Sequence, residues 1–272
     1  MADPQPPVRH HATSLPPTAV AAVLEAVRRG EPWRRALESV AVDSGAEEAI
    51  ESIANEACGN WVWLTSFVGR DAALDVGGAV SSMAPALSRH FRVVHHLEAS
   101  ALLAEFAARR FAQDRLPNVT VSRGSPAALP FRDNAFDCMT LHGAIPRIDA
   151  RAATVRAIFS ECRRVLRPGG RVYIAFRNPV WYGRFADTAA WHDGERAIVP
   201  AARVAGFTEL ERYYAFPTFD RPRVLVPGTR RASYARETVE ARGSIRRPAR
   251  RAAALLGLYA LLAPSVVLIA HK

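Results

Sequence analysis

A glycine-containing turn and a later acid have the spacing of a nucleotide-binding site. The segment 74–81 reads LDVGGAVS, and Glu98, 23 residues after Asp75, ends a second hydrophobic run, VVHHLE. A turn after a strand needs glycine where φ is positive or where a ligand presses on the backbone. A carboxylate that ends the next strand can accept hydrogen bonds from both hydroxyls of a ribose. The pattern therefore predicts a site for an adenosine-containing cofactor.

Three further segments follow in order: LPF at 129–131, DNAFD at 133–137, and VLRPGG at 165–170 before the β-rich run RVYIAF. With the turn and the acid, this ordered set resembles the class I S-adenosylmethionine-dependent methyltransferases. That family typically shows an acid-x-Gly-x-Gly-x-Gly turn, an acid that ends strand two, an LPF-x-D-x-x-FD segment and an R-V-L-x-P-G-G turn. The resemblance covers roughly residues 60 to 215, and it implies S-adenosylmethionine as the cofactor.

The resemblance implies an α/β fold, with a Rossmann-like seven-stranded methyltransferase sheet, helices on both faces, an N-terminal helical cap and an insertion before the last strand. The alternation of β-rich and helical runs from residue 71 also predicts a parallel sheet with right-handed crossovers. We expect strands near 72–76, 92–97, 119–122, 136–141, 171–177, 208–216 and 266–270. We expect helices near 18–29, 33–42, 46–57, 82–89, 100–112, 151–166, 195–205 and 249–262.

The chain of 272 residues is long enough for one α/β domain with additions. We predict a disordered leader (1–17), an N-terminal helical cap (18–60), a methyltransferase core (61–218), an Arg-rich insertion (219–250), and a C-terminal helix and last strand that complete the core (251–272). The proline-rich leader lacks the apolar centre of a secretory signal. The three cysteines are far apart in the sequence and form no Cys-x-x-Cys pair, which favours core positions in a reducing cytoplasm.

In the resembled family, the first acid of the turn helps to hold the turn and the cofactor's ammonium group, and the glycines let the backbone approach the methionine portion. Asp75 and Gly77 match the first two marked positions, and Gly78 occupies a variable position. Ala79 and Ser81 stand where the second and third glycines usually are. Since alanine adds a methyl group where the backbone should come close, we expect a lower cofactor affinity or a displaced turn.

The resemblance assigns the ribose hydroxyls to Glu98, with Ala99 at the start of the next helix. Gly124, Ser125 and Pro126 fall where many relatives place an acid that binds the adenine amino group. The Ser125 hydroxyl can form a hydrogen bond there, though a weaker one than a charged acceptor would form.

Leu141 and His142, at the end of the fourth predicted strand, lie where the methyl donor and acceptor should meet. Positioning and loss of water supply much of the rate of methyl transfer. If the acceptor is a hydroxyl, a base helps, and His142 is the best-placed candidate, because histidine ordinarily titrates near neutral pH. The alternative is a structural or merely exposed histidine. His192, in the aromatic segment 178–194, is a second candidate in what we interpret as a substrate-facing lid.

The formal net charge is +10, and nearly all of the positive charge is arginine because Lys272 is the only lysine. Ten arginines crowd between 221 and 251, near only three acids. This segment predicts a local positive field, and two interpretations stay open: a solvated insertion, or contact with an anionic substrate, a lipid surface or nucleic acid.

The stretch 252–270 is nearly all apolar and has the length of a membrane span. Pro264 favours another interpretation, a helix that stops before it and a strand after it. Peripheral membrane contact by this helix stays open, because 246–251 is basic. We predict no metal site: His95 and His96 share a strand, so their rings point to opposite faces of the sheet.

These observations favour a cytoplasmic methyltransferase that acts on a small-molecule acceptor, at oxygen. The alternative keeps the fold without efficient chemistry, so that the basic insertion binds a partner, a membrane surface or nucleic acid. A dinucleotide dehydrogenase would need Gly-x-Gly-x-x-Gly, where 77, 79 and 82 read Gly, Ala and Ser. Nucleic-acid acceptors are disfavoured, because the sequence after the fourth strand is Leu-His-Gly-Ala rather than Asn-Pro-Pro-Tyr or Asp-Pro-Pro-Tyr. The sequence identifies neither the acceptor nor the oligomeric state.

Overall fold

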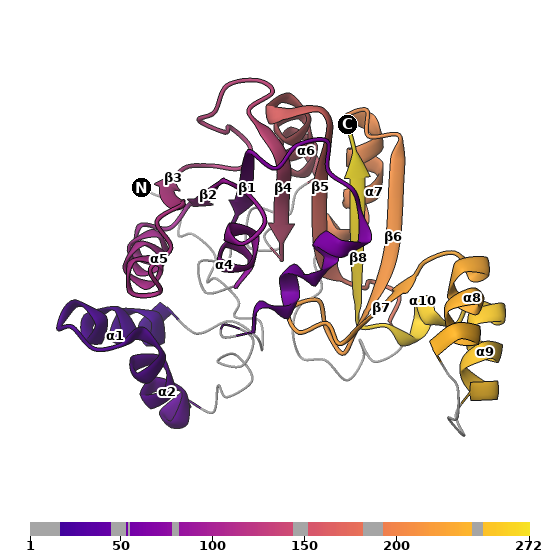
Figure 1. Cartoon of the computed structure of the whole chain (residues 1–272), viewed down its shortest axis with the longest axis horizontal. Helices are drawn as coiled ribbons and strands as arrows, with labels where there is room; N and C mark the ends of the chain where they lie inside the picture. The colour runs from indigo at the N-terminus through magenta and orange to yellow at the C-terminus, as the bar shows by residue number, and fades with distance from the viewer. Residues whose placement is uncertain are drawn as a thin grey trace, which may run out of the picture.

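The computed structural model describes residues 17–44, 53, 55–77, 82–143, 152–181, 193–240 and 247–272. Its strands are β1 (Ala72–Val76), β2 (Val93–Glu98), β3 (Val119–Arg123), β4 (Phe136–His142), β5 (Leu166–Arg177), β6 (Glu209–Phe216), β7 (Val224–Pro227) and β8 (Ser265–His271). They form one sheet in the order β3-β2-β1-β4-β5-β8-β6-β7 (Figure 1). The pairs from β3 to β5 are parallel, while β8 is antiparallel to β5 and β6.

The predicted fold class is confirmed, but the sheet has eight strands rather than seven. The additional strand, β7, pairs antiparallel with β6 and lies inside the segment predicted as an insertion. It is only four residues long and lies between Pro222 and Gly228. Such a short apolar run next to turn residues does not distinguish a strand from a loop in the sequence.

The described helices are α1 (Pro17–Arg28), α2 (Trp33–Ser44), the 3₁₀ helix η1 (Glu56–Leu64), α4 (Met83–Ser88), α5 (Ala101–Gln113), α6 (Ala152–Val165), α7 (Asp193–Val204), α8 (Arg230–Glu240), α9 (Arg247–Leu256) and α10 (Tyr259–Leu262). None of them, within the part of the chain that the structure describes, is long and apolar enough to cross a membrane. Residues 1–16 of the predicted leader lie outside the described residues. Most of the predicted helix at 46–57 lies outside them as well.

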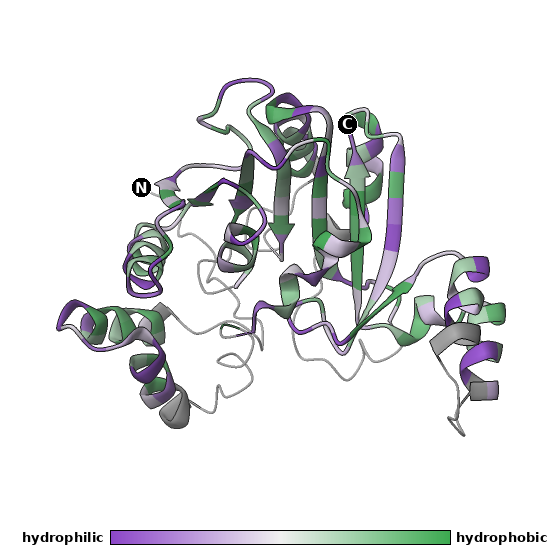
Figure 2. Ribbon diagram, in the orientation of Figure 1, coloured by the Kyte–Doolittle hydropathy of each residue, from purple (hydrophilic) through white to green (hydrophobic). Residues whose placement is uncertain are grey.

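The two faces of the sheet are covered by different helices. Residues of α6 and α7 pack on one face, and residues of η1, α4 and α5 pack on the other. Side chains alternate between these faces along β4: Met139 and Leu141 belong to the first core, and Cys138 to the second. The same alternation places Thr140 and His142 on the face covered by η1 and α4. Figure 2 shows the resulting concentration of apolar residues in the strands.

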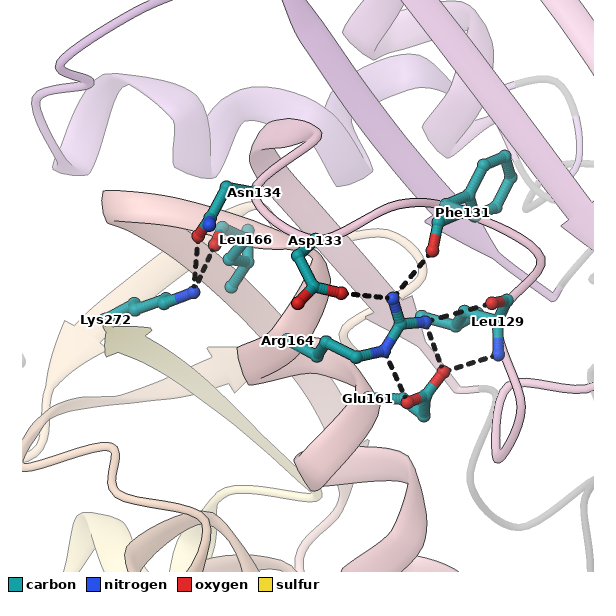
Figure 3. Close-up of polar contacts among 8 residues, drawn as sticks. All are labelled: Leu129, Phe131, Asp133, Asn134, Glu161, Arg164, Leu166 and Lys272. Atoms are coloured by element: carbon teal, nitrogen blue, oxygen red, sulfur yellow. Dashed lines mark hydrogen bonds and ion pairs between the residues drawn. The ribbon is translucent and has the colours of Figure 1, made fainter.

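The LPF and DNAFD segments form a polar network at the amino-terminal edge of the parallel strands (Figure 3). The Arg164 guanidinium, on α6, donates to the backbone oxygens of Leu129 and Phe131, at 3.0 and 2.7 Å. It also donates to the carboxylates of Asp133 and Glu161, and Glu161 in turn accepts from the Leu129 amide at 2.7 Å. This network fixes the chain just before β4 enters the sheet.

The C-terminal segment forms two short helices and a strand. The prediction of a helix that stops before Pro264 and of a strand after it is confirmed, with a break between α9 and α10 at Gly257. Gly257 has φ +71°, and the next amide, of Leu258, donates to the Ala253 oxygen at 2.8 Å. Glycine suits this helix-ending turn because the left-handed conformation carries no Cβ penalty there.

Candidate active site

The carboxyl ends of β1, β2 and β4 meet at one edge of the sheet, the lower edge in Figure 1. Gly77 follows β1 with φ +72°, a conformation that a side chain would strain. Its amide donates to the Leu97 oxygen at 2.8 Å, so the turn starts directly beside the end of β2. Gly78, Ala79 and Ser81 lie outside the described residues.

The Asp75 carboxylate is fully buried and joins three strands. Its Oδ2 lies 2.9 Å from His96 Nδ1, on β2, and its Oδ1 accepts a hydrogen bond of 2.5 Å from Thr140 Oγ1, on β4. Both oxygens therefore have partners inside the protein. This geometry accounts for a positioning role beneath the turn, and contact with a cofactor ammonium group stays a prediction.

Glu98 ends β2 with a nearly buried side chain, which is 7% exposed. Its Oε1 accepts from the amides of Ala99 and Ser100, at 2.9 and 3.2 Å. Ser100 caps α5, because its hydroxyl accepts from the Leu103 amide. The carboxylate is thus held in place at the positive end of a helix, at the edge where the resemblance assigns the ribose hydroxyls.

The segment from Gly124 to Pro126 runs beside Glu98, because the Gly124 amide donates to the backbone oxygen of Glu98 at 3.2 Å. The Ser125 hydroxyl accepts from the Ala127 amide at 3.3 Å, and the Ser125 backbone oxygen accepts from Ala128 at 3.1 Å. The hydroxyl predicted to contact adenine therefore takes part in its own turn. The structure brings Gly77, Glu98 and this turn together at one edge, as the sequence predicted for these positions.

His142, at the end of β4, is buried and faces a carboxylate from another part of the chain. Its Nε2 lies 3.2 Å from Asp220 Oδ1, in the loop between β6 and β7. Its ring is stacked with that of Tyr173 at 6.1 Å and meets the Phe219 ring edge-on at 5.1 Å. A carboxylate only accepts hydrogen bonds, so in the neutral imidazole Nε2 carries the proton and Nδ1 the lone pair. Nδ1 is buried and has no hydrogen-bond partner among the described residues.

The other predicted residues are placed as follows. The Leu141 side chain is fully buried in the core on the opposite face of the sheet from His142. His192 and most of the predicted lid lie outside the described residues. Within the described part of the chain, no group of His, Cys, Asp or Glu side chains could hold a metal ion. A cavity of about 300 Å³ that includes Arg92 and His95 lies at the opposite, amino-terminal edge of the sheet, away from His142.

Comparisons with known proteins match the region that forms this site. The family model described as "Methyltransferase domain" matches residues 74–174, a span that includes Asp75, Glu98 and His142. Residues 74–174, a little over a third of the chain, therefore match a methyltransferase domain. The domain is 37% identical over 65 residues to the ubiquinone/menaquinone biosynthesis C-methyltransferase UbiE of Cronobacter sakazakii, which is 24% of this chain and 24% of that protein. The chain thus spans about a quarter of the length of this curated relative.

Solved structures resemble the methyltransferase domain in fold. A methyltransferase of Thermotoga maritima, described as a possible histamine N-methyltransferase, superposes with a TM-score of 0.56 at 17% identity, over 85% of this chain and 96% of that one. Phosphoethanolamine N-methyltransferase 2 of Haemonchus contortus, in complex with phosphomonomethylethanolamine and S-adenosylhomocysteine, gives 0.51 at 19% identity, over 80% of this chain and 52% of that one. At these identities, the likeness establishes the fold.

Aromatic rings form a buried stack next to His142. Trp61 of η1 stacks on Tyr173 at 4.5 Å between ring centroids, and both side chains are buried. Burial and then the nearby charges of Asp220 and Asp75 raise the pKa of the Cys58 thiol. Burial also raises the pKa of the Tyr173 phenol well above its ordinary value. Both groups therefore stay protonated at neutral pH.

Sequence reasoning missed Asp220 and Phe219 as site residues. In the sequence, Asp220 is one of the three acids near the Arg-rich segment, 78 residues after His142, and nothing there links it to that histidine. One signal was available: both residues follow the run 208–216, predicted as a strand, and an acid directly after a strand often lies at a site edge. The run did not reveal that β6 points the same way as β4 in the methyltransferase sheet, which places its loop beside His142.

Proposed function

We propose that this domain transfers a methyl group from S-adenosylmethionine to the hydroxyl of a small molecule, and that His142 removes the hydroxyl proton. The observation that carries the proposal is the pair of His142 Nε2 and Asp220 Oδ1, 3.2 Å apart, with Nδ1 left as an acceptor. A cytoplasmic site of action belongs to the same proposal and is consistent with three buried, free cysteines.

The residues at the edge of the sheet fit the cofactor. Gly77 keeps the backbone accessible after β1, and the Glu98 carboxylate is held in place by the first amides of α5. A held carboxylate accepts hydroxyl hydrogen bonds with little loss of side-chain entropy. When bound, S-adenosylmethionine supplies an electrophilic methyl group on a sulfonium. In the proposal, Glu98 orients the ribose, and the turn at 124–126 lies beside the adenine.

The acceptor's proton goes to His142 in this mechanism. Nδ1 would take the proton from the acceptor hydroxyl, and the imidazole would become an imidazolium; the hydroxyl oxygen would gain the methyl group as the bond from methyl to sulfur breaks, with S-adenosylhomocysteine as the leaving group. Asp220 stabilises that positive charge and holds the tautomer in which Nδ1 is basic. Tyr173 and Phe219 fix the plane of the ring. A base of this kind contributes about 10²- to 10⁴-fold to rate.

A second candidate function keeps the fold without efficient methyl transfer. The Ser125 hydroxyl already accepts a hydrogen bond within its turn, and this turn carries no acid that could bind the adenine amino group. This observation favours weak cofactor binding. The two candidates differ in one measurable quantity, the affinity for S-adenosylmethionine.

Isothermal titration calorimetry of the full chain with S-adenosylmethionine and S-adenosylhomocysteine tests the cofactor site. We expect micromolar binding, weakened about 10-fold or more by Glu98→Gln, because a hydrogen bond to a charged group contributes about 1.5–3 kcal/mol. Glu209→Gln is the matched control, since that glutamate is exposed at the opposite edge of the sheet. Absence of wild-type binding would favour the second candidate function.

A further inference from the structure

The helices α9 and α10 and the turn between them expose five leucines. Leu255, Leu256, Leu258, Leu261 and Leu262 are 55%, 64%, 36%, 48% and 41% exposed. We call these five residues the leucine surface. Scattered apolar residues are ordinary on a protein surface, but a contiguous group of large ones marks a place of contact.

The exposure of the leucine surface follows from how these helices pack. Ala254, Tyr259 and Ala263 occupy the inner side and are buried, with Tyr259 edge-on to Phe216 of β6 at 5.9 Å. The reversal at Gly257 then turns the remaining side chains outward. Small inner residues and one aromatic anchor suffice to attach the helices, so the leucines are not needed for the core.

The leucine surface lies at the same edge of the sheet as the methyl-transfer site. Asn178 directly follows β5, and its side chain donates to the backbone oxygens of Ala260 and Ala263, at 2.6 and 2.8 Å. The Asn178 amide also donates to the Pro264 oxygen at 2.9 Å. These bonds attach α10 to the carboxyl end of β5, next to β4 and His142. Figure 1 shows α8, α9 and α10 together beside this edge.

Positive charge adjoins the leucine surface. The sequences of α8 and α9 contain six arginines and two glutamates. Arg230 and Arg231 are exposed at the start of α8. The Arg230 Nε lies 2.9 Å from the place that a Cβ on Gly257 would occupy, between Leu256 and Leu258 in the chain. Apolar and cationic groups therefore occupy one continuous region.

This combination fits one kind of partner best. An anionic lipid bilayer offers an apolar interior for leucine side chains and phosphates for arginines at the depth of the head groups. An apolar protein surface would match only the leucines, and nucleic acid would match only the arginines. We propose that the leucine surface docks on an anionic lipid bilayer, with Arg230 and Arg231 at the head groups. The docking goes beyond the proposed methyl transfer and does not depend on it.

Flotation of the full chain with lipid vesicles, in the absence of cofactor, tests the docking. We expect binding to vesicles of phosphatidylglycerol and phosphatidylcholine in equal parts, and much weaker binding to phosphatidylcholine alone. Leu256→Ser combined with Leu261→Ser should weaken binding about 10-fold or more, because two large side chains no longer enter the bilayer. Arg230→Gln combined with Arg231→Gln should reduce binding to the anionic vesicles.

The control is Val204→Ser, an exposed apolar position (76%) at the end of α7, near the opposite edge. It should bind vesicles as wild type does, and circular dichroism should show that all variants are folded. The proposal is overturned if the leucine variant binds as wild type does, or if both vesicle types bind equally well. It is also overturned if wild type binds neither vesicle type; light scattering of the leucine variant then tells whether the surface instead joins two copies of the chain. Calorimetry with S-adenosylmethionine reports separately on the proposed function.

Discussion

Asp137 and Arg167, from two of the segments that carry the family resemblance, form an ion pair with 2.7 Å between Oδ1 and the guanidinium nitrogen. The other oxygen of Asp137 accepts from the amides of Asp71 and Ala72, at 2.9 and 3.0 Å. The Asp137 carboxylate, on β4, thus connects the start of β1 to the start of β5. The final aspartate of the DNAFD segment and the arginine of VLRPGG are therefore in direct contact in the folded protein.

Asp137→Asn should destabilise the fold by about 2 kcal/mol, because a nearly buried acceptor of three hydrogen bonds loses its charge. The midpoint of urea unfolding measures the change. Asp133→Asn is the matched control: its side chain is 69% exposed, so the loss should stay below about 1 kcal/mol. Equal losses in the two variants would contradict a special role for Asp137.

Thr140→Val should cost about 1–3 kcal/mol, because the buried Asp75 carboxylate loses the hydroxyl that donates to it. The two side chains have similar shapes, so packing changes little. Thr120→Val makes the same change at an exposed position of β3 and should leave stability within about 0.5 kcal/mol. Thermal unfolding of both variants checks the difference, and an unchanged Thr140→Val protein would remove the positioning role assigned to Asp75.

Stability should fall in acid partly through Glu161. Hydrogen bonds from Arg164, and more weakly from the Leu129 amide, lower the pKa of this carboxyl below its ordinary 4.5. A depressed pKa means that the ionised form stabilises the folded state above pH 4.5, and that this contribution is lost as pH falls through the lowered value. Urea midpoints measured across this range should drop less steeply in Glu161→Gln than in wild type. Glu38→Gln, at an exposed position of α2, should keep the wild-type slope.

The fold was predictable because the segments that signal it are structural. Arg164 and Asp137 fix the chain before β1 and β4, so the sequence pattern reflects contacts that any similar sheet requires. Gly77 and Glu98 were equally accessible to prediction, since each directly follows or ends a strand. Among the described elements, the sequence did not predict the 3₁₀ helix η1, the helix α8 or β7, a four-residue edge strand whose pairing depends on β6.

Asp220, the carboxylate that faces the candidate base His142, could not be predicted in the same way. Asp220 meets His142 only because β8 inserts between β5 and β6 and sets the direction of β6. That pairing joins residues far apart in the chain, and no local periodicity encodes it. The exposure of the leucine surface was hidden for a similar reason, because an apolar helix next to Pro264 is equally typical of a core.

Asp220→Asn should lower kcat for a hydroxyl acceptor about 10-fold or more while leaving calorimetric binding of S-adenosylmethionine unchanged. The amide no longer stabilises the imidazolium, and it can donate to Nε2 and so place the proton on Nδ1. His142→Gln should lower kcat about 100-fold in the same assay, because the proposed base is removed. Asp71→Asn, at an exposed position of the opposite edge, is the control and should retain wild-type rates. If Asp220→Asn keeps full activity, or loses activity only together with cofactor binding, Asp220 supports the loop and not the base.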